Sequence, residues 1–365
     1  MKILFDGFGI THHVGNSLGS YTNEIISLIN NTEDEIDFNV LLYNIDKPTS
    51  DLSFKNVTPL YLNIDRSIYP SPNINTVINR YEIDLYHDPN NGFLAPEEPI
   101  NNYIVSLNTL LPYLEPTLVD DKFKRSFYKR VPYALEICKY LLVPTKAFKE
   151  DVLRTFPKMK DKIICSYPKI NEIFSPKDTL ESSKFILNNY NINSPFLLYV
   201  GDISKRKSIE KLIYILKNLA STPLKLVLIG DYKKKKYAYY RHILELASSL
   251  SLEDKIIFLG KIPQHNLPYF YSNALCTIDF SIYNSYPLSS VEAVHCKSVV
   301  IVNDTPSNKE ILKKSAFFID SANLNIAVDM IKTLYSRKNI KGKLTGNLSN
   351  PVAGDLKELF NLYEK

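Results

Sequence analysis

Three segments place glycine, cations or small polar residues at the ends of apolar runs, where a parallel sheet can bind an anion. The most informative segment, 201–207 (GDISKRK), follows the apolar run 196–200 and precedes a helical pattern that begins at Ser208. A helix start carries partial positive charge and free N–H groups, which favour phosphate. Arg206 and Lys207 add two cations there. We therefore predict a diphosphate site, with a solvated basic loop as the alternative.

The second segment, 15–19 (GNSLG), joins the first strand pattern to a helical pattern that begins near Ser20. A glycine-bearing turn that opens a helix offers amide groups to an anion. Two glycines alone are a weak signal, and a plain connecting loop fits the pattern equally well.

The third segment, 283–294 (YNSYPLSSVEAV), follows the apolar run 275–280 and leads into a helical pattern near Ser289. This turn would present the backbone N–H groups of Leu288 and Ser289 to an anion. Glu292 lies one turn into the helix, where its carboxylate would accept hydrogen bonds from a sugar diol. A glutamate near a helix start more often compensates the helix dipole when it has no such context.

The elements that must position these segments alternate regularly along the chain. Short β-rich runs alternate with amphipathic helical patterns, which is typical of a parallel sheet covered on both faces. A polar stretch over 171–195 interrupts the alternation and predicts a linker between two domains. Strand patterns occupy 2–5, 38–43, 85–87, 103–107, 140–143 and 162–166, and after the polar stretch 196–200, 224–229, 256–259, 275–280 and 299–302; helical patterns include 21–29, 146–156, 208–219 and 239–249.

Composition limits the class of protein. A chain of 365 residues with 45% hydrophobic and 23% charged residues suits two globular domains. The formal charge of +5 is too small to indicate a nucleic-acid partner, although it is compatible with an anionic substrate or peripheral contact at the inner face of a membrane. The lysine run 233–236 fits such contact, but a solvated loop is favoured. Without a long apolar run or a secretion signal, we expect a cytoplasmic protein with four reduced cysteines and no metal site.

Residues 193–320 resemble the C-terminal domain of the family 4 (group 1) retaining glycosyltransferases. The resemblance rests on FLLYVGDISKRKSIEKLI, LKLVLIGDY, IIFLGKIPQHNLPYFYSNA and IYNSYPLSSVEAVHCKSVVIVNDTPSNKEIL, and more weakly on SLGSYTNEI, DLYHDPN and LLVPTKAFKEDVLRTF in the first half. It implies a GT-B architecture, with two doubly wound Rossmann-like domains facing across a cleft. The expected acceptor domain covers 1–172, the expected donor domain covers 173–349, and a C-terminal helix over 350–365 crosses back to the first domain.

The resemblance also implies roles for individual residues. Lys207, with Arg206, would hold the donor diphosphate and stabilise it as it leaves. Glu292 matches the second glutamate of the E-x7-E element, which binds the ribose. Family members need no metal, so we expect no metal and no cofactor beyond the nucleotide-sugar co-substrate. Further donor contacts are implied for Ile262 at the nucleobase, for the amides of Leu288 and Ser289 at the phosphates, and for Gly15, Ser17 and Gly19 in the turn that closes from the first domain.

The chain departs from the family pattern at four places. Asn284 replaces the first glutamate of E-x7-E, and Asn108-Thr109 replaces a His-Asp pair; we count Asn284 and Asn108 among the catalytic candidates. Pro287 replaces a glycine, and Asp202 replaces an arginine. Two hypotheses follow. The first is a retaining glycosyltransferase that acts on a cell-surface glycan, lipid-linked or protein acceptor. The alternative is an inactive subunit that binds or chaperones an active partner glycosyltransferase.

Overall fold

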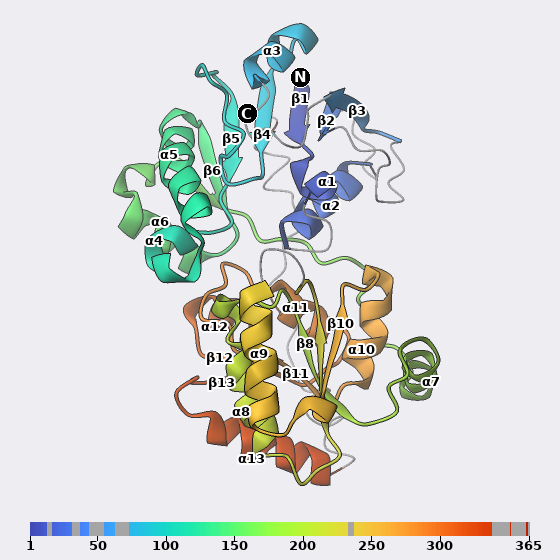
Figure 1. Cartoon of the computed structure of the whole chain (residues 1–365). Helices are drawn as coiled ribbons and strands as arrows, with labels where there is room; N and C mark the ends of the chain where they lie inside the picture. The colour runs from blue at the N-terminus through green and yellow to red at the C-terminus, as the bar shows by residue number, and fades with distance from the viewer. Residues whose placement is uncertain are drawn as a thin grey trace. The chain divides into compact units, whose positions relative to one another are not determined.

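The computed structural model describes residues 1–12, 17–30, 37–43, 55–62, 73–232, 237–337, Pro351 and Tyr363. Its contacts divide the chain into two units. Unit 1 comprises Met1–Lys169 and Ala353–Lys365, and unit 2 comprises Ile170–Val352. Each unit is built on one parallel sheet flanked by helices (Figure 1). The sequence placed the domain boundary between residues 172 and 173 and assigned 350–365 to the first domain.

Unit 1 holds a seven-stranded parallel sheet in the order β3-β2-β1-β4-β5-β6-β7. Apolar side chains of β1, β2 and α2 form its main described core, and Tyr363 packs into the same core. The strands are β1 (Lys2–Asp6), β2 (Asp37–Tyr43), β3 (Thr58–Leu62), β4 (Leu85–Asp88), β5 (Tyr103–Ser106), β6 (Tyr140–Val143) and β7 (Ile163–Cys165), and the helices are α1 (Phe8–His12), α2 (Ser17–Asn30), α3 (Ile74–Tyr81), α4 (Leu111–Leu114), α5 (Asp121–Ile137) and α6 (Lys146–Thr155).

Unit 2 holds a six-stranded parallel sheet in the order β10-β9-β8-β11-β12-β13. Its four inner strands are almost wholly buried, which explains their continuous apolar sequences. The strands are β8 (Phe196–Val200), β9 (Lys225–Ile229), β10 (Ile256–Gly260), β11 (Cys276–Asp279), β12 (Val300–Asn303) and β13 (Phe317–Ile319), and the α-helices are α7 (Thr179–Tyr190), α8 (Ile209–Lys217), α9 (Tyr237–Ser249), α10 (Leu267–Asn273), α11 (Leu288–His295), α12 (Pro306–Leu312) and α13 (Leu324–Ser336).

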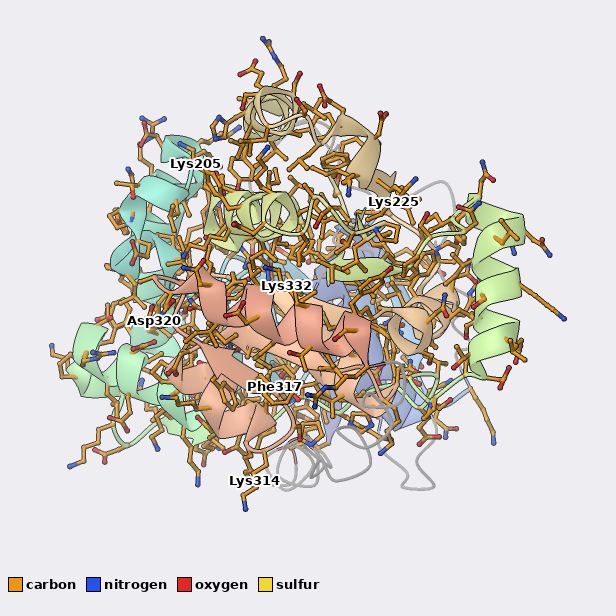
Figure 2. The ribbon with its side chains drawn as sticks, turned by 90° about the horizontal axis from the view of Figure 1, so that it is seen from below. Lys205, Lys225, Lys314, Phe317, Asp320 and Lys332 are labelled. Atoms are coloured by element: carbon orange, nitrogen blue, oxygen red, sulfur yellow. The ribbon has the colours of Figure 1, made fainter. Side chains whose placement is uncertain are left out.

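The helices of unit 2 cover both faces of its sheet. Helices α8, α9 and α13 pack their apolar sides into one core with the strands, whereas α10 and α11 contact each other outside that core. Figure 2 labels Lys332 of α13, and this side chain is exposed. The predicted doubly wound fold is therefore confirmed for each unit.

The predicted linker over 171–195 is wrong in its middle, because α7 lies there. Asp178 caps this helix by accepting from the N–H groups of the next turn, and Asn191 ends it in a left-handed conformation. Helix α7 packs against α10, where Phe185 stacks on Tyr269 with ring centroids 4.2 Å apart. Most of its surface is polar and exposed, so the sequence shows little apolar periodicity.

Candidate functional site

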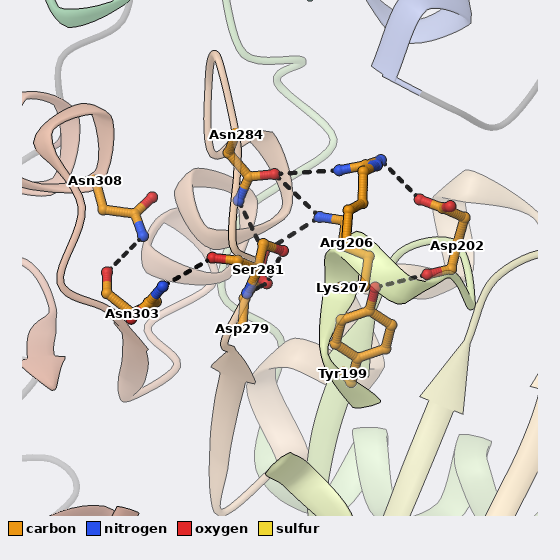
Figure 3. Close-up of polar contacts among 9 residues, drawn as sticks. All are labelled: Tyr199, Asp202, Arg206, Lys207, Asp279, Ser281, Asn284, Asn303 and Asn308. Atoms are coloured by element: carbon orange, nitrogen blue, oxygen red, sulfur yellow. Dashed lines mark hydrogen bonds and ion pairs between the residues drawn. The ribbon is translucent and has the colours of Figure 1, made fainter. Parts of the chain in front are cut away.

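The candidate site lies where the strand order of unit 2 reverses, between β8 and β11. In open parallel sheets, ligands bind beyond the carboxyl ends of the strands at such a reversal. The loop after β8 carries Asp202, Arg206 and Lys207, and the end of β11 carries Asp279. Asn284 follows in the next loop, and its amide lies between the two cations and Asp279 (Figure 3).

Two glycines fix the course of the loop after β8. A Cβ at Gly230 would lie only 1.8 Å from the carbonyl oxygen of Gly201, and the φ of Gly230 is +148°. Only glycine allows this close approach. The Tyr199 hydroxyl then donates to the Asp202 carbonyl oxygen at 2.8 Å, and the Ile203 N–H donates to the Asp231 carbonyl oxygen at 3.1 Å. The loop is thereby held against the loop that follows β9.

Lys207 is a buried cation with a buried carboxylate beside it. Its Nζ lies 3.4 Å from Asp279 Oδ2 and 3.2 Å from Asn284 Oδ1. The side chains of Lys207 and Asp279 are only 8% and 4% exposed, so water screens this pair poorly. Burial lowers the pKa of Lys207, and the neighbouring Asp279 opposes that shift. Removing either partner would leave the other as an unpaired buried charge.

Asp279 is held in its ionised form by its surroundings. Burial alone would raise the pKa of Asp279, but Lys207 and the hydrogen bonds from Ser281 outweigh burial and lower it. The Ser281 N–H donates to Asp279 Oδ1 at 2.8 Å, and the Ser281 hydroxyl donates to the same oxygen. Asn303 Nδ2 donates to the Ser281 carbonyl oxygen at 3.0 Å, and Asn308 Nδ2 donates to the Asn303 carbonyl oxygen at 2.8 Å. These amides connect the ends of β11 and β12.

Arg206 is the more exposed of the two cations, and it is also paired. Its guanidinium lies 2.8 Å from Asp202 Oδ1 and 3.5 Å from Asn284 Oδ1. The side chains of Arg206 and Asp202 are 28% and 20% exposed. The structure thus brings together the predicted residues Arg206, Lys207 and Asn284. The sequence did not identify the carboxylate partners of the two cations, although Asp279 closes an apolar strand and Asp202 precedes Arg206 by four residues.

Helix α8 follows segment 201–207 as predicted, with Ser208 at its N-cap position, but the two cations precede the helix. Arg206 and Lys207 lie in a 3₁₀ turn, Lys205–Lys207, and α8 begins only at Ile209. Ser208 has a left-handed φ of +49°, and its side chain makes no capping hydrogen bond. The first amide of α8 is taken, because the Ile209 N–H donates to the Tyr239 hydroxyl at 3.1 Å.

The remaining predicted donor contacts of unit 2 lie near the same strand ends. Ile262 follows β10 and is half-buried, and Ser289 lies in the first turn of α11, where the helix supplies no partner for its amide. The Leu288 N–H was predicted to face an anion, but it donates to the Tyr286 carbonyl oxygen at 3.0 Å. Glu292 is 5% exposed and accepts from the Tyr271 hydroxyl at 2.9 Å. An internal partner thus occupies one oxygen of the carboxylate predicted to bind ribose.

The other predicted residues belong to unit 1. Asn108 follows β5, where its N–H donates to Asn91 Oδ1 at 2.6 Å and its Nδ2 donates to the Pro89 carbonyl oxygen at 3.0 Å. Gly19 is buried in α2. Ser17 is the first residue of α2, and its side chain is not described. Gly15 and the lysine run 233–236 lie outside the described residues.

Unit 1 has a buried carboxylate pair at its own strand reversal, between β1 and β4. Asp6 accepts from the Tyr43 hydroxyl and from the Phe8 N–H, the latter at 2.8 Å. Burial, together with repulsion from Asp88, raises the pKa of Asp6 to about 8. Burial also raises the pKa of Asp88 to about 6, although three hydrogen bonds and Arg130 oppose the shift. The native unit therefore holds a proton that the unfolded chain releases at lower pH.

We expect the replacement Asp6→Asn to stabilise unit 1, and to do so more at pH 8 than at pH 5. As pH rises from about 4 to 8, the folded state keeps the Asp6 proton and the unfolded state loses it. The free energy of unfolding then falls by up to about 1.4 kcal/mol per pH unit. Asparagine removes this dependence and keeps the acceptor for Phe8. Urea denaturation at each pH measures the slope, with the exposed Asp161→Asn as control; an unchanged slope in Asp6→Asn would contradict the assignment.

Next to this pair, His87 joins three elements of unit 1. Its Nε2 lies 2.7 Å from Ser106 Oγ, and its Nδ1 lies 2.6 Å from the Tyr363 hydroxyl. The Tyr21 hydroxyl lies 3.1 Å from the same Ser106 Oγ. Burial lowers the pKa of His87 to about 3, so the imidazole is neutral at physiological pH. These contacts attach Tyr363 to the centre of the unit 1 sheet.

No helix in the described ranges is long and apolar enough to cross a membrane. Within the same ranges, no group of three or more His, Cys, Asp or Glu side chains is placed to hold a metal ion.

Comparison with protein families and curated proteins gives matches to glycosyltransferases. A family model described as "Glycosyl transferases group 1" matches residues 183–347. O-antigen chain mannosyltransferase RfbU of Salmonella typhimurium is 23% identical over 223 residues, which are 60% of this chain and 57% of the relative. O-antigen chain mannosyltransferase B of Escherichia coli is 21% identical over 272 residues, which are 74% of this chain and 69% of the relative. The match thus spans little more than half the length of the first of these relatives.

Solved structures share the fold over nearly the whole chain. A glycosyltransferase from Rickettsia africae has a TM-score of 0.73 at 16% identity, covering 100% of this chain and 98% of that chain. Anabaena HepE in complex with UDP and glucose has a TM-score of 0.72 at 15% identity, covering 95% and 93%. WaaG, a glycosyltransferase involved in lipopolysaccharide biosynthesis, has a TM-score of 0.71 at 13% identity, covering 94% and 93%. The architecture is therefore that of the GT-B glycosyltransferases.

Proposed function

We propose that this chain is a glycosyltransferase that transfers a sugar from a nucleotide-diphosphate sugar with retention at the anomeric carbon. The match of residues 183–347 in unit 2 to the group 1 glycosyl transferase model supports this proposal. One observation carries the proposal: Arg206 and Lys207 lie side by side at the strand reversal of unit 2, joined by Asn284. A protein that binds a dianionic diphosphate needs cations at such a position.

Lys207 would stabilise the diphosphate as it leaves. An ammonium group donates three hydrogen bonds, and the contacts with Asp279 and Asn284 use two of them. The third would go to a phosphate oxygen, with Arg206 as the second cation. In the retaining reaction, the bond between the anomeric carbon and the diphosphate oxygen breaks, and the acceptor oxygen bonds to the same face of that carbon. The acceptor proton passes to the departing phosphate. Catalysis then consists of positioning and electrostatic stabilisation.

The relatives indicate which substrates to test first. Two curated relatives are named mannosyltransferases of an O-antigen chain, and one solved protein of the same fold is titled with UDP and glucose. We propose a hexosyl donor and a glycan acceptor of the polysaccharide type, bound to unit 2 and unit 1 respectively. We also propose that the reaction needs no metal, because Lys207 and Arg206 supply positive charge where the diphosphate would lie.

A ligand screen followed by a transfer assay tests the proposed function. We expect UDP or GDP, and the corresponding hexose donors, to raise the melting temperature of the purified protein, whereas uridine and guanosine do so much less. The donor that binds should then be hydrolysed slowly, and EDTA should leave this activity intact. A folded protein that no nucleoside diphosphate stabilises would contradict the donor site. Binding without hydrolysis or transfer, unless a partner glycosyltransferase is added, would instead support an inactive subunit.

A further inference from the structure

The two cations of the candidate site are already matched by two carboxylates. Lys207 faces Asp279 at 3.4 Å, and Arg206 faces Asp202 at 2.8 Å. Two positive and two negative groups sum to a formal charge of zero. Both cations are therefore already paired when a diphosphate enters the site. One carboxylate has to move away from its cation before that cation can attract the ligand with its full charge.

The two carboxylates, Asp279 and Asp202, differ in how readily each can separate from its cation. The Asp279 side chain is 4% exposed and accepts both the N–H and the hydroxyl of Ser281, so its position is fixed. The Asp202 side chain is 20% exposed and belongs to a loop. Water can solvate a carboxylate that turns outward from Asp202, whereas Asp279 would have to remain in the interior. Asp202 is therefore the group that can release its cation.

The backbone of Asp202, in contrast, cannot move away. Its carbonyl oxygen accepts from the Tyr199 hydroxyl at 2.8 Å, and the preceding Gly201 is packed against Gly230. The carboxylate can thus change rotamer but stays within reach of Arg206. When the site empties, the same side chain can return to the guanidinium. The guanidinium of Arg206 has a second contact in this structure, with Asn284 Oδ1 at 3.5 Å.

We propose that Asp202 is an internal competitor for Arg206: it holds the guanidinium while the donor is absent, and yields it to the diphosphate when the donor binds. This inference rests on the proposed function. Asp202 is a positioning residue in this account, because it acts on the ligand through Arg206. It lowers the affinity of the site for nucleoside diphosphate and speeds the release of that product.

Binding of UDP and GDP to Asp202→Asn tests the proposal. We expect the dissociation constant of the nucleoside diphosphate that binds the wild type to fall about tenfold, because the Arg206 guanidinium no longer has to leave a carboxylate before it contacts the phosphates. The dissociation rate in stopped-flow experiments should fall with it. Binding of uridine or guanosine should not change. Asp329→Asn, the same replacement on the exposed side of α13, is the matched control.

A double-mutant cycle with Arg206→Gln distinguishes an effect of Asp202 through Arg206 from direct repulsion between Asp202 and the phosphates. If Asp202 acts through Arg206, Asp202→Asn should have little effect in the Arg206→Gln background. An equal gain in both backgrounds would mean that Asp202 repels the phosphates directly, and would overturn the proposal. An unchanged or weaker affinity of the folded Asp202→Asn variant for the nucleoside diphosphate would also overturn the proposal. Failure of the wild-type protein to bind either nucleoside diphosphate would instead refute the proposed function itself.

Discussion

Replacing Lys207 with methionine should weaken the binding of nucleoside diphosphates by roughly 10- to 100-fold, because a hydrogen bond to a charged group contributes about 1.5–3 kcal/mol. Binding of the nucleoside alone should change little, since the ammonium group would contact only the phosphates. Methionine keeps the apolar stem of the side chain, which is buried. Isothermal titration with UDP and uridine, or with GDP and guanosine, measures the difference.

The same variant should also lose stability, so a control must separate folding from binding. Lys207→Met leaves Asp279 as a buried carboxylate without its cation, which costs about 3–5 kcal/mol. The double variant Lys207→Met with Asp279→Asn removes both charges and should recover much of the melting temperature. We expect it to recover none of the affinity. Equal losses for nucleoside and nucleoside diphosphate would show that Lys207 does not contact the phosphates.

Asp279→Asn alone should make donor binding depend strongly on pH. Asparagine keeps an acceptor for the Ser281 N–H but leaves Lys207 buried without a negative partner. Burial already lowers the pKa of Lys207, and loss of Asp279 lowers it further. Above the new pKa, the affinity for a nucleotide sugar should fall by about tenfold per pH unit, because binding then requires uptake of a proton. In the wild type, Asp279 favours the charged ammonium of Lys207, so the affinity should fall at a higher pH than in this variant.

Stability of this variant should change with pH in the opposite direction. Unfolded Lys207 keeps its proton to about pH 10, whereas the native variant releases it earlier, so the unfolded state binds more protons and stability rises with pH. Calorimetric titration with a UDP- or GDP-sugar and thermal unfolding over the same pH range provide the two curves. If affinity and stability fall together as pH rises, the lost interaction is not the one between Asp279 and Lys207.

The inner strands of both sheets were predictable because burial on both faces demands continuous apolar runs. The predicted bounds of β6 and β8 match the structure, at Tyr140–Val143 and Phe196–Val200. Helix α7 was not predicted, since its interior contacts are few and its composition resembles that of a loop. The short edge strands β3 and β13 were also missed; at the edge of a sheet, a strand such as Thr58–Leu62 is half-exposed and its pattern is less regular.

The sequence predicted the two cations of the candidate site but not the carboxylates that pair with them. Arg206 and Lys207 stand out in sequence because they follow a strand that ends in glycine. Asp279 is 72 positions from Lys207, and only the placement of β11 beside β8 brings the two together. Asp202 was recognised as a departure from the family pattern, but its contact with Arg206 depends on the course of the loop. The free amide expected at Leu288 is absent because the local turn bonds it to Tyr286.

The division of the chain into units has a consequence for how the protein is made. Unit 1 combines Met1–Lys169 with Ala353–Lys365, so the unit that leaves the ribosome first is completed last. His87 is translated 276 residues before Tyr363, the partner of its Nδ1. Throughout that interval the nascent unit 1 lacks the Tyr363 ring of its core, while all of unit 2 emerges and can fold. A stop codon shortly before Tyr363 would therefore damage the earlier-made of the two units and leave the later-made unit 2 intact.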